Sequence, residues 1–87
     1  MKVKYDQDAD AVYFYLLDTE IVDSEEIYPG IVYDFDKNDQ VVGVEVLAVK
    51  HRSYSEFLDL ISSEESLLSS QQKKELRRGF SELLFMA

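Results

Sequence analysis

The sequence contains no cysteine and no tryptophan, and it has only one histidine, one proline and three glycines among its 87 residues. Without cysteine the chain has no disulfide, no thiolate metal cluster and no cysteine nucleophile. The single histidine, His51, cannot form a typical zinc site, because such a site needs several nitrogen or sulfur ligands. No run of about 18 apolar residues occurs, so the sequence predicts no membrane-spanning segment.

The start of the chain does not have the pattern of a secretory signal, in which a basic segment precedes an apolar one. Lys2 and Lys4 alternate there with Val3 and Tyr5, which is a strand pattern. We therefore expect a cytoplasmic protein. A chain of this length is normally one domain with a small core. We predict a single domain over residues 1–87, with strands in residues 1–49 and a helical extension in residues 53–86.

Basic residues are scarce in the first half of the chain. The formal net charge is -9, and residues 1–49 carry 12 acidic and 3 basic side chains, whereas residues 50–87 carry 6 of each. An acidic surface repels phosphate, because nucleic-acid binding depends on Lys and Arg. We therefore do not expect direct binding to nucleic acid. A basic partner protein or a divalent cation suits this charge, and solubility alone is the simplest alternative explanation.

The first half of the sequence predicts an antiparallel β-meander of four to five strands. Residues 11–17 are aromatic and β-branched and apolar on both faces, which suits an interior strand. Aspartates at 6, 8 and 10 indicate a turn before this strand, and the only proline, in Pro29-Gly30, marks a break. The predicted strands cover residues 2–5, 11–17, 21–28, 31–35 and 41–47.

The clearest predicted element is a hairpin of residues 31–35 and 41–47. If Asn38-Asp39 is a two-residue loop, the apolar residues of both strands fall on one face, and a slip of one residue would destroy this separation. The predicted pairs are Phe35 with Val42, Tyr33 with Val44 and Ile31 with Val46 on one face, and Asp34 with Gly43 and Val32 with Glu45 on the other.

The second half of the sequence predicts helices. Ser53-Tyr54-Ser55-Glu56 has the Ser-x-x-Glu form of a capping box, and further helix starts are indicated at residues 62–65 and 69–72. Because helices follow strands instead of alternating with them, we predict an α+β fold in which two C-terminal helices pack on the sheet. The last helix has an apolar stripe of Leu76, Phe80, Leu83 and Leu84.

Three segments carry a resemblance to a known family. Residues 5–13 read YDQDADAVY, residues 29–36 read PGIVYDFD and residues 41–47 read VVGVEVL. They resemble the patterns Y-D-x-x-A-D-A-L-Y, P-G-V-x-x-D-x-D and V-V-G-I-E-I-L of the small prokaryotic family called domain of unknown function 2283, the YuzE-like group. The resemblance covers residues 1–52. Asp39 departs from it, because the family usually has Gly in this turn, and the helical tail after residue 52 is not part of the common pattern.

The resemblance implies a small antiparallel sheet plus a helix, and it implies no established reaction. Some members of the family lie beside toxin-like genes, which suggests an antitoxin-like role. The helical tail is then the segment in which features particular to this chain are expected.

No metal site is assigned from the sequence, and the only candidate metal ligands are Asp6, Asp8 and Asp10. Their spacing resembles the start of a calcium-binding loop, but Ala11 stands where such a loop needs Gly and Leu17 where it needs Glu, which excludes an EF-hand. Loose binding of Mg²⁺ or Ca²⁺ by these carboxylates is one interpretation. The other interpretation is that Asp6 and Asp10 hold a tight turn by accepting hydrogen bonds from nearby backbone amides.

The aromatic strand suggests an interface. Tyr13 and Tyr15 share one face of residues 11–17, and Val12 and Phe14 share the other with Leu16. A sheet that is apolar on both sides needs two covers, and large exposed apolar patches are rare on monomers. We therefore predict a homodimer. The alternative is that the long C-terminal helix covers the second face within one chain.

Two functions are consistent with the sequence. The first is a non-enzymatic protein-interaction module without a cofactor. An antitoxin-like protein that binds a basic partner such as a toxin is one form of it. The alternative is a divalent-metal-dependent hydrolase or nuclease-like enzyme that uses Asp6, Asp8, Asp10 and Asp34, since paired carboxylates can serve as general acid and base in a cleft. No catalytic residue is assigned. The candidate binding residues are Asp6, Asp10, Tyr13, Tyr15, Asp34 and Glu45.

Overall fold

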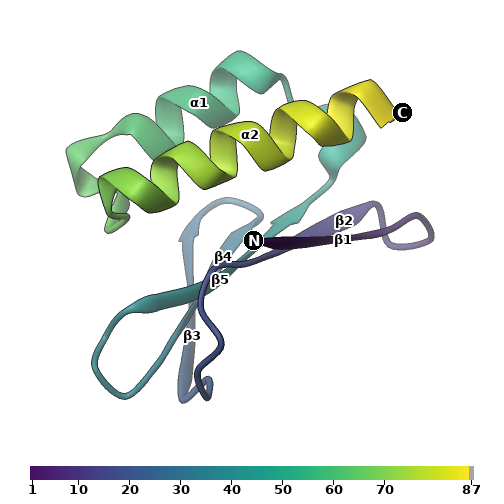
Figure 1. Cartoon of the computed structure of the whole chain (residues 1–87). Coiled ribbons are helices and arrows are strands. Elements are labelled where there is room, and N and C mark those ends of the chain that lie inside the picture. Colours follow the sequence, from purple (N-terminus) through teal and green to yellow (C-terminus); the bar gives the residue numbers. More distant parts are fainter. Residues whose placement is uncertain (87) are drawn as a thin grey trace. The chain divides into compact units, whose positions relative to one another are not determined.

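Five strands precede two α-helices along the chain in a computed structural model that describes residues 1–86, with side chains described as far as Leu83. The strands lie in one compact unit, residues 1–51, and both α-helices lie in a second unit that begins at Arg52 (Figure 1). The fold is α+β, as predicted. The predicted change from strands to helices near residue 50 is confirmed.

The strands form one antiparallel sheet with the order β1-β2-β5-β4-β3. The antiparallel sheet is confirmed, but the meander order is wrong, because β5 lies between β2 and β4. The three most apolar strands, β2, β5 and β4, occupy the interior of the sheet. The charged strands β1 and β3 form its edges, where their exposed side chains stay in water. The strands are β1 Lys2–Asp6, β2 Ala11–Tyr15, β3 Asp23–Tyr28, β4 Ile31–Phe35 and β5 Val41–Leu47.

The β4–β5 hairpin has nearly the predicted register. Tyr33 faces Val44, and the other predicted pairs that involve Ile31, Val32 and Asp34 are also confirmed. The predicted pair of Phe35 with Val42 is wrong, because the register shifts after Asp34 and Phe35 faces Val41 instead. An extra residue on one strand of this kind is a β-bulge, which increases the local twist of the sheet.

The turn between β4 and β5 is longer than the predicted two-residue loop, because Asp36 organises it. The amide of Asp36 donates to the carbonyl oxygen of Gln40 at 3.0 Å, and the amide of Asp39 donates to the carbonyl oxygen of Asp36 at 3.1 Å. Asp39 has a φ of 60°, in the left-handed region that Asp tolerates better than most residues. The aspartate therefore adopts the conformation that Gly would supply at this position.

Strands β2 and β3 are shorter than predicted. β2 ends at Tyr15, because the amides of Leu16 and Leu17 both donate to the carbonyl oxygen of Val42, at 2.9 and 3.1 Å, and this interrupts the regular ladder. β3 begins at Asp23, two residues later than predicted.

Alternate residues of β2 point to opposite faces of the sheet, as predicted. Val12 and Phe14 are fully buried, and they face Val46 and Val44 of β5. Tyr13 and Tyr15 lie on the other face, which we call the tyrosine face. By the register of the strands, the tyrosine face comprises Lys2, Lys4, Asp6, Ala11, Tyr13, Tyr15, Gly43, Glu45, Leu47, Val32, Asp34, Ser24 and Glu26.

All three predicted helix starts are confirmed. Serine hydroxyls accept hydrogen bonds from backbone amides at each start, which satisfies donors that have no partner within the helix. Ser53 caps α1 Tyr54–Ser62, Ser63 caps the 3₁₀ helix Glu64–Ser66, and Ser69 precedes α2 Ser70–Met86. A further 3₁₀ helix, Val49–His51, follows β5. In residues 1–86 no helix has the length and apolar character needed to cross a membrane.

The two α-helices contact each other through stacked aromatic rings. The rings of Phe57 and Phe80 are nearly parallel, with centroids 4.3 Å apart, and Tyr54 stacks on Phe80 at 5.9 Å. The hydroxyl of Tyr54 donates to the carbonyl oxygen of Arg77 at 3.3 Å. Ring pairs at these distances stabilise a contact beyond the burial of their area, so these rings join α1 to α2.

The predicted apolar stripe of α2 is confirmed as far as side chains are described. Leu76 and Phe80 are fully buried, and Leu83 is half-buried. The side chain of Leu84 lies outside the described residues.

Candidate functional site

A hydrogen-bonded row crosses the tyrosine face from β2 to β3. The hydroxyl of Tyr13 on β2 donates to Asp34 Oδ2 at 2.5 Å, and the hydroxyl of Ser24 on β3 donates to Asp34 Oδ1 at 2.5 Å. Both oxygens of one carboxylate on β4 are thus held by donors from two other strands. Hydrogen bonds to an ionised carboxylate are short and stronger than neutral ones, so this row fixes the position of three side chains.

The hydroxyl of Tyr13 reaches Asp34 because Gly43 lies between them. Strand β5 separates β2 from β4, and its residue Gly43 faces Asp34 on one side and Tyr15 on the other. A Cβ atom at position 43 would overlap the hydroxyl and ring of Tyr13. Glycine leaves room for the phenol to cross the intervening strand.

The chemistry of Tyr13 suits its role as a donor. Burial raises the pKa of the Tyr13 phenol, and the hydrogen bond to Asp34 raises this pKa further. The phenol therefore keeps its proton at neutral pH and donates a hydrogen bond to the carboxylate of Asp34. This row is a positioning device in which the proton stays on the tyrosine.

The exposed end of the tyrosine face is aromatic and basic. The ring of Tyr15 is tilted against that of Tyr13 with centroids 4.6 Å apart, and Nζ of Lys2 lies 5.4 Å from the centroid of Tyr15. A cation over a tyrosine ring at this distance is attracted by the ring. Tyr15 remains 41% exposed, so its ring is available to a partner.

Four of the six predicted binding residues come together on this face. Tyr13 faces Glu45 across the β2–β5 pair, and Glu45 is half-buried. Tyr15 and Asp34 lie in the neighbouring row, on either side of Gly43. The fold therefore brings these four candidate residues to one face of the sheet.

Asp6 belongs to the turn between β1 and β2. Its Oδ1 atom accepts hydrogen bonds from the amides of Asp8 at 3.0 Å and Ala9 at 3.2 Å. The interpretation of Asp6 as a turn-forming residue is confirmed. Its carboxylate provides the nearby backbone donors with an acceptor, which is the usual local role of aspartate.

Asp10 connects the same turn to the segment that follows β5. Its carboxylate accepts hydrogen bonds from the hydroxyl of Tyr5 at 3.0 Å and from the amide of Lys50 at 3.1 Å. The amide of Val49 donates to the carbonyl oxygen of Asp10 at 3.1 Å. Asp10 therefore holds two distant segments together, a role that could not be read from the local sequence.

Three of the four carboxylates proposed for a metal-dependent enzyme accept hydrogen bonds from the protein. Asp6 and Asp10 lie at the β1–β2 turn, and Asp34 lies in the row described above. Among the residues that the structure describes, no group of three His, Cys, Asp or Glu side chains is placed to hold one metal ion.

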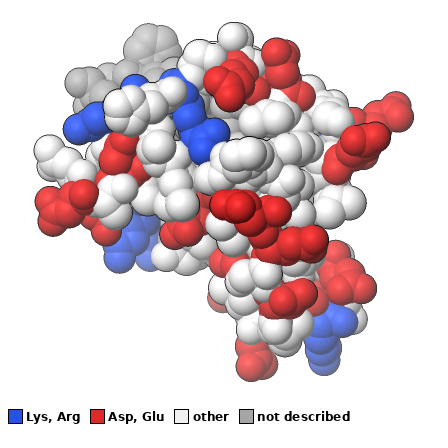
Figure 2. Space-filling view, turned by 180° about the vertical axis from the view of Figure 1, so that it is seen from behind, with Lys and Arg blue, Asp and Glu red and all other residues white. Residues whose placement is uncertain are grey.

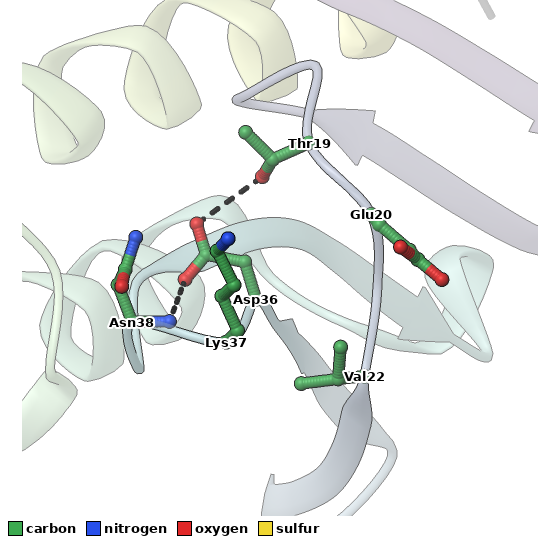
Figure 3. Close-up of a pocket in the computed structure, with 6 residues that line it drawn as sticks. All are labelled: Thr19, Glu20, Val22, Asp36, Lys37 and Asn38. Carbon is green, nitrogen blue, oxygen red and sulfur yellow. Dashed lines mark hydrogen bonds between the residues drawn. The ribbon is translucent and has the colours of Figure 1, made fainter.

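Sequence reasoning placed Asp36 among the acidic residues near the hairpin but assigned it no role, and the structure buries it at 3% exposure. Its Oδ1 atom accepts a hydrogen bond from the amide of Asn38 at 2.9 Å, and its Oδ2 atom accepts one from the hydroxyl of Thr19 at 3.2 Å (Figure 3). Oδ1 also accepts a hydrogen bond from the amide of Gln40 at 3.0 Å. The bond from Gln40, supported by those from Asn38 and Thr19, holds the pKa of Asp36 below its ordinary value despite the opposing effect of burial. The carboxylate is therefore ionised at neutral pH.

A small cavity lies beside Asp36, at the end of the sheet where β3 begins. Its volume is about 260 Å³, and Figure 3 shows the β2–β3 connection on one side and the β4–β5 turn on the other. The volume is below the range of about 300–1,000 Å³ that is usual for small-molecule sites. The lining residues are Thr19, Glu20, Val22, Asp36, Lys37 and Asn38.

Acidic side chains predominate over basic ones on the surface that Figure 2 shows. This agrees with the net charge of -9. A surface of this sign attracts cationic partners and repels anionic ones.

The fold and these features define an α+β protein built on a five-stranded antiparallel sheet with an aromatic and acidic face. The model of the family described as "Protein of unknown function (DUF2283)" matches residues 2–50, and the chain belongs to this family. The resemblance found in the sequence is thereby confirmed. No curated protein and no solved structure matched the chain.

Proposed function

We propose that this protein is a non-enzymatic interaction module of the cytoplasm that binds a basic partner protein, as an antitoxin binds its toxin. The observation that carries the proposal is the tyrosine face, where Tyr15 is exposed and where Glu45 and Asp34 lie on the same face of the sheet. Tyrosine is enriched at protein interfaces, and opposite charge increases the rate and specificity of association. The net charge of -9 favours a partner rich in Lys and Arg.

The face is also organised before any partner arrives. The bonds from Tyr13 and Ser24 to Asp34 hold these side chains in place in the free protein. A partner that docks here loses less binding free energy to the ordering of side chains. This supports a binding role for the hydrogen-bonded row, and a binding role involves no catalysed reaction.

The test is affinity capture with the full-length protein from its native host. We expect a stoichiometric protein with a net positive charge, released as the salt concentration rises because the attraction is screened. The variant Tyr15→Ser/Glu45→Gln should lose this protein. The matched control is Leu67→Ser/Asp59→Asn in the second unit, which also removes one exposed apolar side chain and one charge.

Two results would contradict the proposal. The first is that the wild-type protein retains no stoichiometric partner. The second is that the tyrosine-face variant retains the partner as fully as the wild type, which would remove this face from the interaction.

The predicted homodimer belongs to the same proposal. Tyr15 and Leu47 on the tyrosine face are exposed, and two copies that meet through this face would remove both side chains from water. Light scattering on the purified protein should give twice the protomer mass, and Tyr15→Ser/Glu45→Gln should give the mass of one protomer. A wild-type protein that stays monomeric at all concentrations would refute the dimer.

A further inference from the structure

We propose that the free edge of β3, together with residues 17–22 that precede it, binds an extended segment of a partner protein that carries Lys or Arg, so that this segment adds a sixth strand to the sheet. This inference rests on the proposed function, because it names the form in which the basic partner docks. It places that partner on the edge of the sheet beside the tyrosine face.

The geometry of β3 suits an added strand. β3 is the last strand of the sheet order, and residues 23–26 are exposed. The amide of Ser24 donates to Oδ1 of its neighbour Asp23 at 2.9 Å. Because alternate amides of an edge strand point away from the neighbouring strand, Ser24 and Glu26 present the outward backbone groups. An incoming strand can pair with these groups if its carbonyl oxygen replaces Asp23 Oδ1 as the acceptor for the Ser24 amide.

The opposite edge of the sheet is protected in a way that β3 is not. β1 carries the exposed lysines Lys2 and Lys4, and lysines on an edge strand discourage pairing with other chains. β3 contains neither Lys nor Pro. The register shift between Glu26 and Tyr28 limits regular pairing at its far end, so the docking segment begins before Asp23 and ends near Glu26.

Exposed apolar side chains adjoin this edge. Val22 is 58% exposed and Ile21 is 48% exposed, and Leu17 is also exposed. The amide of Val22 donates to the carbonyl oxygen of Phe35 at 2.8 Å, so the chain already runs beside β4 at this point. Apolar side chains grouped on a surface typically mark an interaction site, and a docked strand would cover them.

The charge of this edge indicates which kind of partner would dock there. No Lys, Arg or His occurs between residues 5 and 36, and residues 17–26 carry five acidic side chains, Asp18, Glu20, Asp23, Glu25 and Glu26. A second copy that docked here through its own β3 edge would bring the same five acidic side chains to the contact. At this edge, a separate basic protein is attracted by the charge that repels another β3 edge.

The cavity beside Asp36 provides a place for one basic side chain. Its volume of about 260 Å³ suits a side chain better than a cofactor. Val22 offers an apolar wall, which suits the apolar stem of Lys or Arg. Glu20 and Asp36 also line the cavity and give it negative charge, while both Asp36 oxygens keep their hydrogen bonds to the chain. Lys37 also lines the cavity, so its charge opposes the occupant and its removal should strengthen binding.

The experiment uses the full-length chain and a blocked synthetic peptide of alternating Lys and Val residues. We expect amide chemical-shift changes in residues 17–26 and 36–40, measured by NMR. The same peptide methylated on alternate backbone nitrogens keeps its charge but cannot pair as a strand, and it should bind at least about tenfold more weakly. A peptide with Glu in place of Lys should not bind.

Matched protein variants separate the edge from the general charge. Asp23→Asn/Glu25→Gln should weaken the peptide about tenfold at low salt, with a smaller difference at high salt. The control Asp8→Asn/Asp59→Asn removes two exposed charges elsewhere and should change affinity less than about twofold. Lys37→Gln should strengthen binding severalfold.

Each contrary result has a distinct meaning. Equal affinity for the methylated peptide would overturn strand addition. Shifts confined to the tyrosine-face residues of β2 and β5 would overturn the β3 edge while the proposed function stands. Self-association of the wild type that shifts the amides of residues 17–26 would make a second copy the occupant of this edge and overturn the inference. Absence of peptide binding would overturn it too, and together with failed affinity capture would also overturn the proposed function.

Discussion

The phenol of Tyr13 lies across Gly43, in the space that a side chain at position 43 would otherwise occupy. Gly43 is on β5, between the strand that carries Tyr13 and the strand that carries Asp34. The missing side chain allows a hydrogen bond between two strands that are not neighbours. The arrangement of the tyrosine face thus depends on one glycine.

Gly43→Ala should destabilise the sheet unit, because its methyl group would push the phenol of Tyr13 away from Asp34. We expect a loss of about 1–3 kcal/mol in the free energy of unfolding, as for other overpacked sites, measured by urea denaturation. The same substitution in a Tyr13→Ala background should cost much less, since the clash is absent there. Equal losses in the two backgrounds would show that the glycine is not required for the tyrosine.

Tyr13→Phe removes the hydroxyl and leaves Asp34 with the donor from Ser24. We expect a loss of about 1 kcal/mol at neutral pH. Because burial raises the pKa of Tyr13 in the folded protein above the ordinary value of about 10, its contribution to stability is complete below pH 10 and declines as the pH rises above that value.

Urea denaturation between neutral and alkaline pH tests this dependence. The wild-type protein should lose more stability above about pH 10 than Tyr13→Phe does. Burial also raises the pKa of Tyr33, so part of the alkaline loss should persist in the variant. Identical pH profiles for the two proteins would contradict the role given to the Tyr13 phenol.

Asp36→Ala should destabilise the β4–β5 turn, because the amides of Gln40 and Asn38 and the hydroxyl of Thr19 lose their acceptor. Since the pKa of Asp36 is lowered in the folded protein, its contribution is present above the unfolded pKa and is lost as the pH falls through the folded value. The stability difference between wild type and variant should therefore shrink in acid. Asp36→Asn keeps one acceptor oxygen and should cost less than Asp36→Ala, and a reversed order would refute this account.

Ser69→Ala should weaken the start of α2. Ser69 and Gln72 form a reciprocal capping box, in which the Gln72 amide donates to Ser69 Oγ and the Ser69 amide donates to Gln72 Oε1, each at 3.1 Å. Loss of the hydroxyl should cost about 1 kcal/mol, measured by thermal unfolding followed by circular dichroism. Ser70→Ala is the matched control and should be nearly neutral, so equal losses would argue against the cap.

Features that depend on residues close together along the chain were predictable from the sequence. The β4–β5 pairing followed from alternating apolar residues, since a strand with one buried face permits only one register. The helix starts followed from serines whose hydroxyls accept nearby amides. The β-bulge in β5, which pairs Phe35 with Val41 instead of Val42, was not predictable. It arises because Asp36 builds a longer turn than the two-residue loop that the sequence suggested.

The sequence by itself determined the strands, the hairpin, the helix caps, the acidic excess and the alternation that puts Tyr13 and Tyr15 on one face. Each of these depends on residues close together along the chain, or on composition alone. Only the tertiary structure decided that β5 lies between β2 and β4, and therefore that Gly43 separates Tyr13 from Asp34. Contacts of this kind join strands far apart in sequence, and their strand order is selected by the burial of whole strands, which no local pattern encodes.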